Sequence, residues 1–428
     1  MGTRVLFTRY HGPPWERIRP LVIFYILFFF FVLLFSPHAY STETRHDSQA
    51  DTDLQSDAGI SDSNNYGVYS RYRFEQIVDD SEQSPYEVSS LMLRAFYKMR
   101  FRKRLNLFVE GSGAQKIGGG HHEENQRVGA NDPEYIGVNQ AYLEWSGDRW
   151  ASRAGRQVIE LDNQRMIGSD RWRQKQQSLD SVMLTLRPTT KWRILYAYLN
   201  RIQTVSDPDR PEGSIDSHSQ LWHLSYAHTY FKTSLYRYHI KLEDQAPLLT
   251  QGARMTGKSA GKRVYLAYEL EYAKQDVEGP FDAEHEYQKL SFELHVNTWA
   301  LQLAYEKLSG QSGRSEFTTP LAALHEYNGW SHLFVHGTQG AGLVDHSVKL
   351  KRRLNGLDLT LSYHAFTNPT AHPLWGELDY GDEIGVQIEE ELGRGFSYIL
   401  RFVDFRAEDG GAVVRDQTRL VLVFIWQR

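Results

Sequence analysis

Apolar and polar residues alternate with a period of two over most of the chain from residue 66 onward. The stretch LDLTLSYHA (357–365) puts its leucines and tyrosine on one face and Asp358, Thr360, Ser362 and His364 on the other. Because successive side chains of a β-strand point to opposite faces, this pattern predicts strands that each have one apolar and one polar face.

About seventeen such segments occur, roughly at 66–78, 89–101, 104–111, 139–146, 150–158, 177–188, 191–202, 220–228, 232–240, 261–274, 285–296, 299–309, 345–352, 357–368, 380–391, 395–407 and 414–426. Many have ten or more residues, whereas strands of soluble proteins usually have about 5–6. A tilted strand that crosses an outer membrane needs about 9–11 residues. Short connections alternate with long polar ones, which is typical of a porin-like transmembrane antiparallel β-barrel. We therefore predict an all-β fold.

A soluble β-sandwich is the alternative, because its strands also alternate between a core face and a water face. Two observations favour the barrel. No helical pattern interrupts the strands, and tyrosine or tryptophan stands near many strand ends, where a membrane protein places an aromatic girdle. The residues in question are Tyr66, Trp145, Trp150, Trp192, Trp299, Tyr380 and Trp426.

The N-terminal region predicts export from the cytoplasm. Arginines precede an apolar run at 21–35, and small residues follow near Ser41. This run is shorter than the roughly 20 residues of a membrane-spanning helix, so residues 1–41 are interpreted as a signal peptide, with an uncleaved anchor as the alternative. Residues 42–65 hold six acidic residues and one arginine, which predicts a disordered acidic periplasmic leader before a barrel at 66–428.

Composition excludes several classes of function. The chain has no cysteine, so disulfides and thiolate metal sites are absent. Acidic and basic residues are nearly balanced from residue 66 onward, which argues against nucleic acid as a partner. No phosphate-binding GxxxxGK[ST] motif occurs, so we expect no cofactor and transport that follows a gradient or an external machine.

Four segments resemble, in the same order, the characteristic segments of the alginate-export family of bacterial outer-membrane proteins. They are YSRYRFE (69–75), NQAYLEW (139–145), GRQVIELDNQRMIGSDRWRQKQQSLDSVML (155–184) and FTTPLAALHEYNGWSHLF (317–334). The resemblance implies a monomeric barrel of about eighteen strands in the cell outer membrane, so one further strand is expected, near 331–336. It also implies passage of an anionic polysaccharide. The chain departs from the usual terminal aromatic residue, and Trp426 is expected to replace it.

The charges of this barrel are expected to lie in its lumen, because a charge that faces lipid costs several kcal/mol. The guanidinium fork binds a uronate carboxylate well, and family members have an electropositive constriction. The predicted anion-binding residues are Arg71, Arg73, Arg94, Arg156, Arg165, Arg171 and Arg173, with Glu75, Asp162 and Asp170 as countercharges. The alternative is a set of ion pairs that brace the wall. Arg153 and Arg156 cannot both point inward on an unbroken pleat.

Segment 317–334 is too apolar for a free loop and too irregular for a strand. Such long loops are usually functional, and we expect this one to fold into the lumen as a constriction. Its candidate residues are Thr319, Pro320, His325, Asn328 and Trp330.

Three further groups were considered. His121 and His122 begin an HHEE run that could bind a cation, although a mobile surface loop is the plainer interpretation. Three glutamates at 389–391 follow other acidic residues, which indicates a solvated rim or a site that bridges calcium to lipopolysaccharide. Ser362 and His364 share a predicted lumenal face without an evident third partner, so we expect neither a metal site nor an enzyme.

The leading hypothesis is an outer-membrane channel for an alginate-like anionic polysaccharide or oligosaccharide. A general or small-anion porin is the alternative, and an outer-membrane barrel enzyme is a remote one. Expected partners are the glycan, outer-membrane lipid and lipopolysaccharide, and periplasmic secretion components. The sequence determines neither the permeant nor the direction of transport nor gating.

Overall fold

The computed structural model describes residues 65–79, 85–117, 132–279, 283–311, 314–369, 371, 376–408 and 414–428. The predicted signal peptide, all but the last residue of the predicted leader, and the histidine-containing segment 121–124 lie outside the described residues. Within the described ranges, no helix is long and apolar enough to cross a bilayer.

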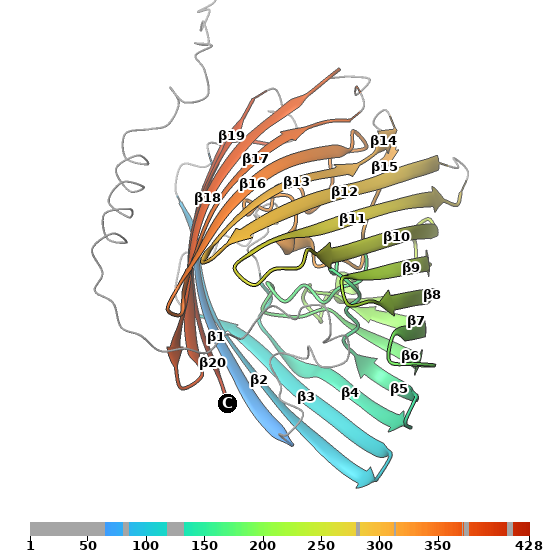
Figure 1. The fold of residues 1–428 in the computed structure, drawn as a ribbon. Helices are drawn as coiled ribbons and strands as arrows, with labels where there is room; N and C mark the ends of the chain where they lie inside the picture. The colour runs from blue at the N-terminus through green and yellow to red at the C-terminus, as the bar shows by residue number, and fades with distance from the viewer. Residues whose placement is uncertain are drawn as a thin grey trace, which may run out of the picture. The chain divides into compact units, whose positions relative to one another are not determined.

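The described chain forms a closed antiparallel barrel of eighteen strands (Figure 1). Neighbours in the chain pair with each other, and the last strand pairs with the first, so the sheet has no free edge. The strands are β1 (Tyr66–Asp79), β2 (Tyr86–Arg102), β3 (Leu105–Lys116), β4 (Tyr135–Ser146), β5 (Trp150–Gln157), β6 (Ser178–Leu186), β7 (Trp192–Gln203), β8 (Ser214–Ala227), β9 (Phe231–Ile240), β10 (Leu248–Lys258), β11 (Val264–Val277), β12 (Ala283–Val296), β13 (Trp299–Leu308), β16 (Leu343–Leu354), β17 (Leu357–Thr367), β18 (Asp379–Gly393), β19 (Phe396–Ala407) and β20 (Gln417–Gln427). Closure pairs the backbone hydrogen-bonding groups of neighbouring strands all around the sheet and leaves no edge exposed to lipid.

The two ends of the barrel differ in their connections. At the end where β1 begins and β20 ends, turns of two to five residues join the strands, and we call this end the turn side. At the opposite end, the loop side, the longest connections are 117–134, 158–177 and 309–342. The last of these contains the short pair β14 (Gly310–Gln311) and β15 (Ser315–Glu316) and the 3-10 helix η4 (Leu324–Glu326), and η3 (Pro211–Gly213) precedes β8. The predicted asymmetry of short turns and long loops is confirmed.

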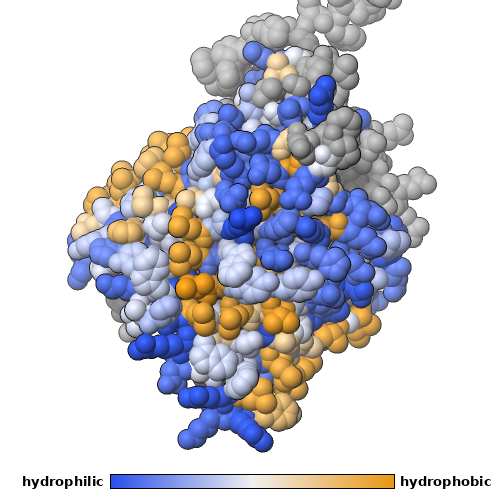
Figure 2. Space-filling view, turned by 90° about the vertical axis from the view of Figure 1, so that its right-hand side faces the viewer, coloured by the Kyte–Doolittle hydropathy of each residue, from blue (hydrophilic) through white to orange (hydrophobic). Residues whose placement is uncertain are grey.

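The two faces of the wall differ in chemistry. On β13, Leu301 and Leu303 are 43% and 53% exposed, whereas Ala300 and Glu306 are buried. The same alternation recurs around the sheet, with large apolar side chains outside and polar or charged ones inside. Figure 2 shows hydrophobic residues gathered at the left and lower parts of one face beside a larger hydrophilic area. Exposed apolar rows of this kind fit a lipid-facing surface.

Strand β10 is the one that the sequence pattern missed, and residues 331–336 belong to a connection instead. Its sequence, LLTQGARMTGK, alternates weakly and contains two glycines. A Cβ on Gly252 would lie 2.5 Å from the Tyr236 ring, and one on Gly257 would lie 2.4 Å from the Tyr268 hydroxyl. Tyrosines of β9 and β11 therefore cover the space above these glycines, so the side chains that complete β10 belong to other segments.

The predicted aromatic girdle is present on the turn side, where six of the seven predicted residues stand at strand ends. Trp145 and Trp150 pack edge to face at 5.2 Å, and Phe396 lies 6.3 Å from Trp426. Tyr380 is a correction. It is fully buried, and its hydroxyl donates to the Gly342 carbonyl at 3.1 Å, because a register irregularity near the start of β18 turns it inward.

The interior is packed on one side. The inner wall of β6 to β9 carries a cluster of apolar side chains, and residues of the connections pack against it. The members of this core are Ile159, Leu161, Met166, Ile167, Leu179, Met183, Leu195, Ala197, Leu199, Ile202, Leu221, Tyr236, Tyr238, Ile240, Leu242, Ala273, Tyr287, Phe317 and Leu321. The barrel is therefore partly filled by its own chain.

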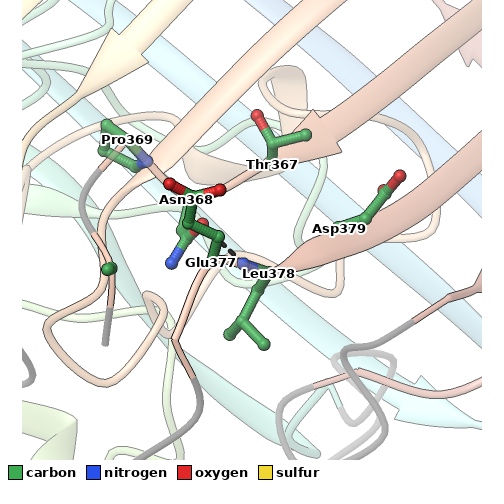
Figure 3. Close-up of a pocket in the computed structure, with 7 residues that line it drawn as sticks. Thr367, Asn368, Pro369, Glu377, Leu378 and Asp379 are labelled. Atoms are coloured by element: carbon green, nitrogen blue, oxygen red, sulfur yellow. Dashed lines mark hydrogen bonds between the residues drawn. The ribbon is translucent and has the colours of Figure 1, made fainter. Parts of the chain in front are cut away.

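A separate cavity of about 450 Å³ lies at the loop side between β17 and β18. Its lining includes Thr367, Pro369, Glu377 and Asp379, and the Asn368 side chain accepts a hydrogen bond from the Leu378 N–H at 2.8 Å (Figure 3). Thr367 and Asp379 end the two strands, and the other lining residues belong to the connection between them.

The two faces predict opposite responses to charge. Leu303→Arg should destabilise the barrel by about 2–4 kcal/mol near the bilayer midplane, because the new charge would meet lipid. The adjacent Gln302→Arg, on the half-buried inner face, should cost much less. Reversible urea unfolding in lipid vesicles measures both. Equal destabilisation by the two variants would contradict the assignment of the faces.

Candidate pore constriction

Two loop-side connections lie inside the barrel, the first inward loop (158–177) and the second inward loop (317–342). Each contacts inward-facing groups of distant strands. Arg71 on β1 donates to Gln174 at 2.9 Å, and Glu383 on β18 accepts the Trp330 N–H at 2.6 Å. Figure 1 shows coil of both segments within the ring of strands. The predicted inward folding of 317–334 thus agrees with the geometry.

Residues that tolerate a positive φ allow the backbone to leave β5 and form the first inward loop. Gly155 has φ 129°, and a Cβ there would lie 2.3 Å from the Ala141 carbonyl, so only glycine fits where β5 turns inward. Asp162 and Asp170 both have φ 51°, a left-handed conformation that aspartate tolerates better than most residues. These positions fold a charged segment compactly enough to fit within the barrel.

Backbone contacts join the two inward loops. Ile167 and Leu321 form a parallel bridge, and the Gly168 N–H donates to the Leu321 carbonyl at 2.7 Å. The Ala323 N–H donates to the Gln164 carbonyl at 3.0 Å. The loops therefore form one unit although about 150 residues separate them in the chain.

Arg165 connects the first inward loop to the second and to the wall. It forms an ion pair with Glu306 of β13 at 2.9 Å and donates to the Asn328 side chain at 2.9 Å. Its guanidinium lies 4.6 Å from the Tyr327 ring centre. Asn328 also donates to Glu306 at 2.7 Å. Arg165 is 2% exposed, so it braces the loops from a buried position.

Asp162 anchors the first inward loop to the opposite wall. It accepts hydrogen bonds from His223 on β8 at 2.9 Å and Ser234 on β9 at 2.8 Å. Lys232 and Arg254 lie 3.7 and 3.9 Å away. The predicted countercharge Asp162 therefore contacts four cationic or polar side chains of the wall.

Asp170 and Arg171 form separate contacts. Asp170 pairs with His325 of the second inward loop at 2.7 Å. Arg171 binds both oxygens of Glu160, at 2.8 and 2.7 Å, and its side chain is 31% exposed. Arg171 is therefore more accessible than Arg165.

The arginines of β1 hold the end of the first inward loop. Arg71 donates to the carbonyls of Arg171 and Arg173, both at 2.6 Å. Arg73 pairs with Asp132, which also binds Arg173 at 2.8 Å. Sequence reasoning missed Asp132, because no local pattern marks a single aspartate shortly before β4 as inward-facing.

Arg401 of β19 stacks against a tryptophan of each inward loop. The Arg401 guanidinium lies 4.4 Å from the Trp172 ring centre and 4.6 Å from the Trp330 ring centre. Gln387 accepts a hydrogen bond from its Nε at 2.8 Å. Trp330 fits there because Gly385 has no side chain, since a Cβ would lie 2.5 Å from the indole. The alternation of β19 predicts an inward-facing Arg401, so the strand pattern is the signal that could have identified it.

Buried side chains of β1, β18 and β20 contact the second inward loop next to Arg401. Glu75 pairs with Arg419 at 2.9 Å, and Arg419 donates to His332 of the second inward loop at 2.6 Å. Glu383 accepts the N–H groups of Trp330 and Ser331 at 2.6 and 2.8 Å. Glu75 therefore positions a guanidinium as predicted, although its closest partner is Arg419.

The remaining predicted arginines lie apart from the inward loops. Arg94 is buried on β2, 3.8 Å from Glu110. Arg153 faces inward and pairs with Glu144 at 2.7 Å, so the alternation of β5 puts Arg156 on the other face. Arg156 binds Asp180 at 2.7 Å. The prediction that Arg156 faces the lumen is therefore corrected.

The other predicted residues of the second inward loop are placed as follows. Thr319 and His325 are buried, and Pro320 is half-buried beside the bridge at Leu321. Asn328 has φ 55°, which suits asparagine at this tight bend. The five candidates therefore belong to one buried turn unit.

The pKa values of Asp132 and His332 are both lowered, but for different physical reasons. Burial would raise the pKa of Asp132, but Arg73 and Arg173 outweigh it and the pKa is lowered. Burial lowers the pKa of His332 well below its ordinary value, and Arg419 lowers it further. Asp132 is therefore an anion and His332 a neutral hydrogen-bond acceptor at neutral pH.

The weaker sequence groups separate in space. His364 pairs with Asp345 at 2.9 Å, but the Ser362 hydroxyl donates to the Gly385 carbonyl instead of to His364. The glutamates at 389–391 lie at the turn side of β18, whereas the acidic residues before them lie at its loop side. Among the described residues, no group of three or more His, Asp or Glu could hold a metal ion.

Comparison with protein families identifies one match. A family model described as alginate export matches residues 62–306. Comparison with the sequences of curated proteins finds no match.

Solved structures with a similar fold include proteins of two bacteria, among them the outer membrane protein OpdK. OccAB1 of Acinetobacter baumannii has a TM-score of 0.71 at 14% identity, over 85% of this chain and 96% of that one. OccAB4 of the same organism has 0.69 at 14%, over 85% and 97%. OpdK of Pseudomonas aeruginosa, solved with vanillate, has 0.67 at 12%, over 85% and 98%. At this identity the likeness shows the fold.

Arg165→Ala should loosen both inward loops, because it leaves Glu306 buried without its cation. Removing one partner of a buried pair costs about 3–5 kcal/mol. We expect higher and noisier single-channel conductance and faster protease cleavage within the loops. Arg201→Ala is the matched control, since its pair with Asp216 is about half exposed and outside the loops. Unchanged channel noise in Arg165→Ala would contradict the bracing role.

Proposed function

The chain belongs to the alginate-export family, and from this premise we propose that it is a passive outer-membrane channel for an anionic polysaccharide or oligosaccharide with uronate-like carboxylates. An outer-membrane channel is the common feature of the family and of the similar folds. The choice of an anionic glycan rests on the side chains of the interior.

The observation that carries this choice is a set of cations beside aromatic rings. On the inner wall, Lys349 of β16 lies 5.7 Å from the Trp330 ring centre, and Lys289 of β12 lies 5.0 Å from that of Tyr327. A sugar acid has a carboxylate and an apolar ring face. An ammonium group next to an aromatic face matches both features.

The predicted arginines have a different part in this proposal. Arg71, Arg73 and Arg165 are at most 7% exposed and are paired, so they fix the positions of the inward loops. Contact with the permeant is assigned to two half-buried cations, namely Arg171 on the first inward loop and Lys349 on the wall. Among the described residues, Lys349 forms no ion pair within 4 Å.

Passive conduction needs binding that is favourable enough for entry and weak enough for release. Several separate cations meet this requirement better than one tight site, because a chain of carboxylates can move from one to the next. Net movement then follows the gradient of the glycan.

A channel for small carboxylates is the second candidate. The amount of the interior that the inward loops and the apolar core occupy favours a narrow path. An enzyme is not proposed, since family and fold relatives are channels.

Block by glycans in planar bilayers tests the proposal. Oligouronates should reduce single-channel current at concentrations where neutral oligosaccharides of equal length do not, and reversal potentials should show anion preference. A small-anion channel would show the anion preference without oligouronate block. Absence of both effects would exclude the proposed function.

Lys349→Met should weaken oligouronate block by roughly 10-fold, which corresponds to about 1.4 kcal/mol per carboxylate contact. Lys307→Met is the matched control, because Lys307 lies on the opposite face of β13. If oligouronate blocks both variants as strongly as it blocks the unmodified protein, Lys349 lies outside the permeation path.

A further inference from the structure

The turns of the barrel are basic. Across all eight turns between consecutive strands on the turn side there are eight basic residues and one acidic residue, Asp148. The basic ones are Lys103, Arg104, Arg149, Arg187, Lys191, Lys262, Arg263 and Arg394. Most are exposed, and Arg104 has only a loose contact of 3.5 Å with Asp148, with side-chain exposures of 59% and 91%.

Cations also lie on the inner wall near the same mouth, where Glu389 and Glu391 of β18 face inward as well. By the strand alternation, Lys98 and Arg100 on β2 face inward with the buried Arg94. Lys258 at the end of β10 lies 6.0 Å from the ring centre of the inward-facing Tyr265. Cations therefore extend from the rim into the mouth.

The loop side has the opposite charge. Its described connections, apart from the two inward loops and the buried Asp132, contain eleven acidic and four basic residues. The acidic residues are Glu134, Asp207, Asp209, Glu212, Glu243, Asp244, Glu278, Glu316, Glu377, Glu408 and Asp416. The barrel has a net charge near zero, yet its turn-side rim is positively charged and its loop-side rim is negatively charged.

We propose that the turn-side mouth is the capture surface for a polyanionic glycan, so the channel is loaded from the periplasm and releases its permeant past the acidic loop side. This inference rests on the proposed function and names the surface that first binds the permeant. Outer-membrane barrels place short turns in the periplasm and long loops outside. Fixed charges cannot drive net transport, which follows the gradient, but they set the side from which a polyanion enters faster.

The position of the cations favours a glycan over lipid headgroups as the occupant. Headgroups surround the outer face of the barrel, whereas Lys98, Arg100 and Lys258 lie on the inner side of the mouth. A polyanion spans several turns at once, so its many contacts add even though salt screens each beyond about 8–10 Å.

The test measures block from each side of an oriented channel. The chain has no cysteine, so Ala246→Cys on an exposed loop-side connection gives a unique thiol. A membrane-impermeant thiol reagent in one chamber then reports the orientation of each inserted channel. An oligouronate of defined length is added to either chamber, in neutral phosphatidylcholine bilayers and in bilayers that contain phosphatidylglycerol.

We expect the half-blocking concentration to be on the order of 10-fold lower from the turn side at 0.1 M salt and nearly symmetric at 1 M salt. The variant K103Q/K191Q/K262Q/R263Q, which changes exposed turn residues, should lose most of the difference. The matched variant D207N/E212Q/E243Q/D244N, on exposed or half-exposed loop residues, should leave block from the turn side within about 2-fold of the unmodified protein.

The outcomes separate the two levels of the proposal. Equal block from both sides would overturn the capture surface and leave the anionic channel intact. Absence of block from either side would instead overturn the proposed function. If the turn variant changes block only when phosphatidylglycerol is present, the turn cations act on lipid headgroups, and the capture surface is overturned.

Discussion

The structure depends on the requirement that every backbone group within the bilayer be hydrogen-bonded inside the protein. Only closure of the sheet meets it for strands, and closure divides every strand into a lipid face and a lumenal face. Charges and irregular backbone then have only the interior and the two rims to occupy. The pairing of β20 with β1 therefore determines where charged segments such as 158–177 can lie.

Charges inside the barrel still need partners, because the interior is partly dry where the loops pack. Burying two charges costs several kcal/mol, and their attraction offsets this cost only with good geometry and further hydrogen bonds. The group around Arg165, Glu306 and Asn328 meets both conditions. Such pairs contribute little net stability, but they define one position for the loops, since any other position would leave a buried charge unpaired.

Much of the fold follows from the period-two pattern, because the alternation is local. It predicts the long strands, the closed barrel and the opposite faces of Arg153 and Arg156. It does not predict β10, whose glycines are covered by Tyr236 and Tyr268 from neighbouring strands. The site was only partly predictable for the same reason. The inward course of 317–334 follows from its apolar residues, whereas the partners Asp132, Arg401 and Arg419 come from distant segments that only the folded barrel brings together.

The distinction between paired and accessible cations changes how charge selection in such a channel is understood. An arginine whose donors are already used by carboxylates and carbonyls, such as Arg71, attracts a permeant weakly. Its sequence motif then reflects the position of a loop more than the recognition of a ligand. In the proposed function, recognition of the permeant passes to cations that retain solvent contact beside aromatic rings, and to the rims. On that proposal the arginine-rich segment influences selectivity indirectly, because it fixes the loops that shape the path of the permeant.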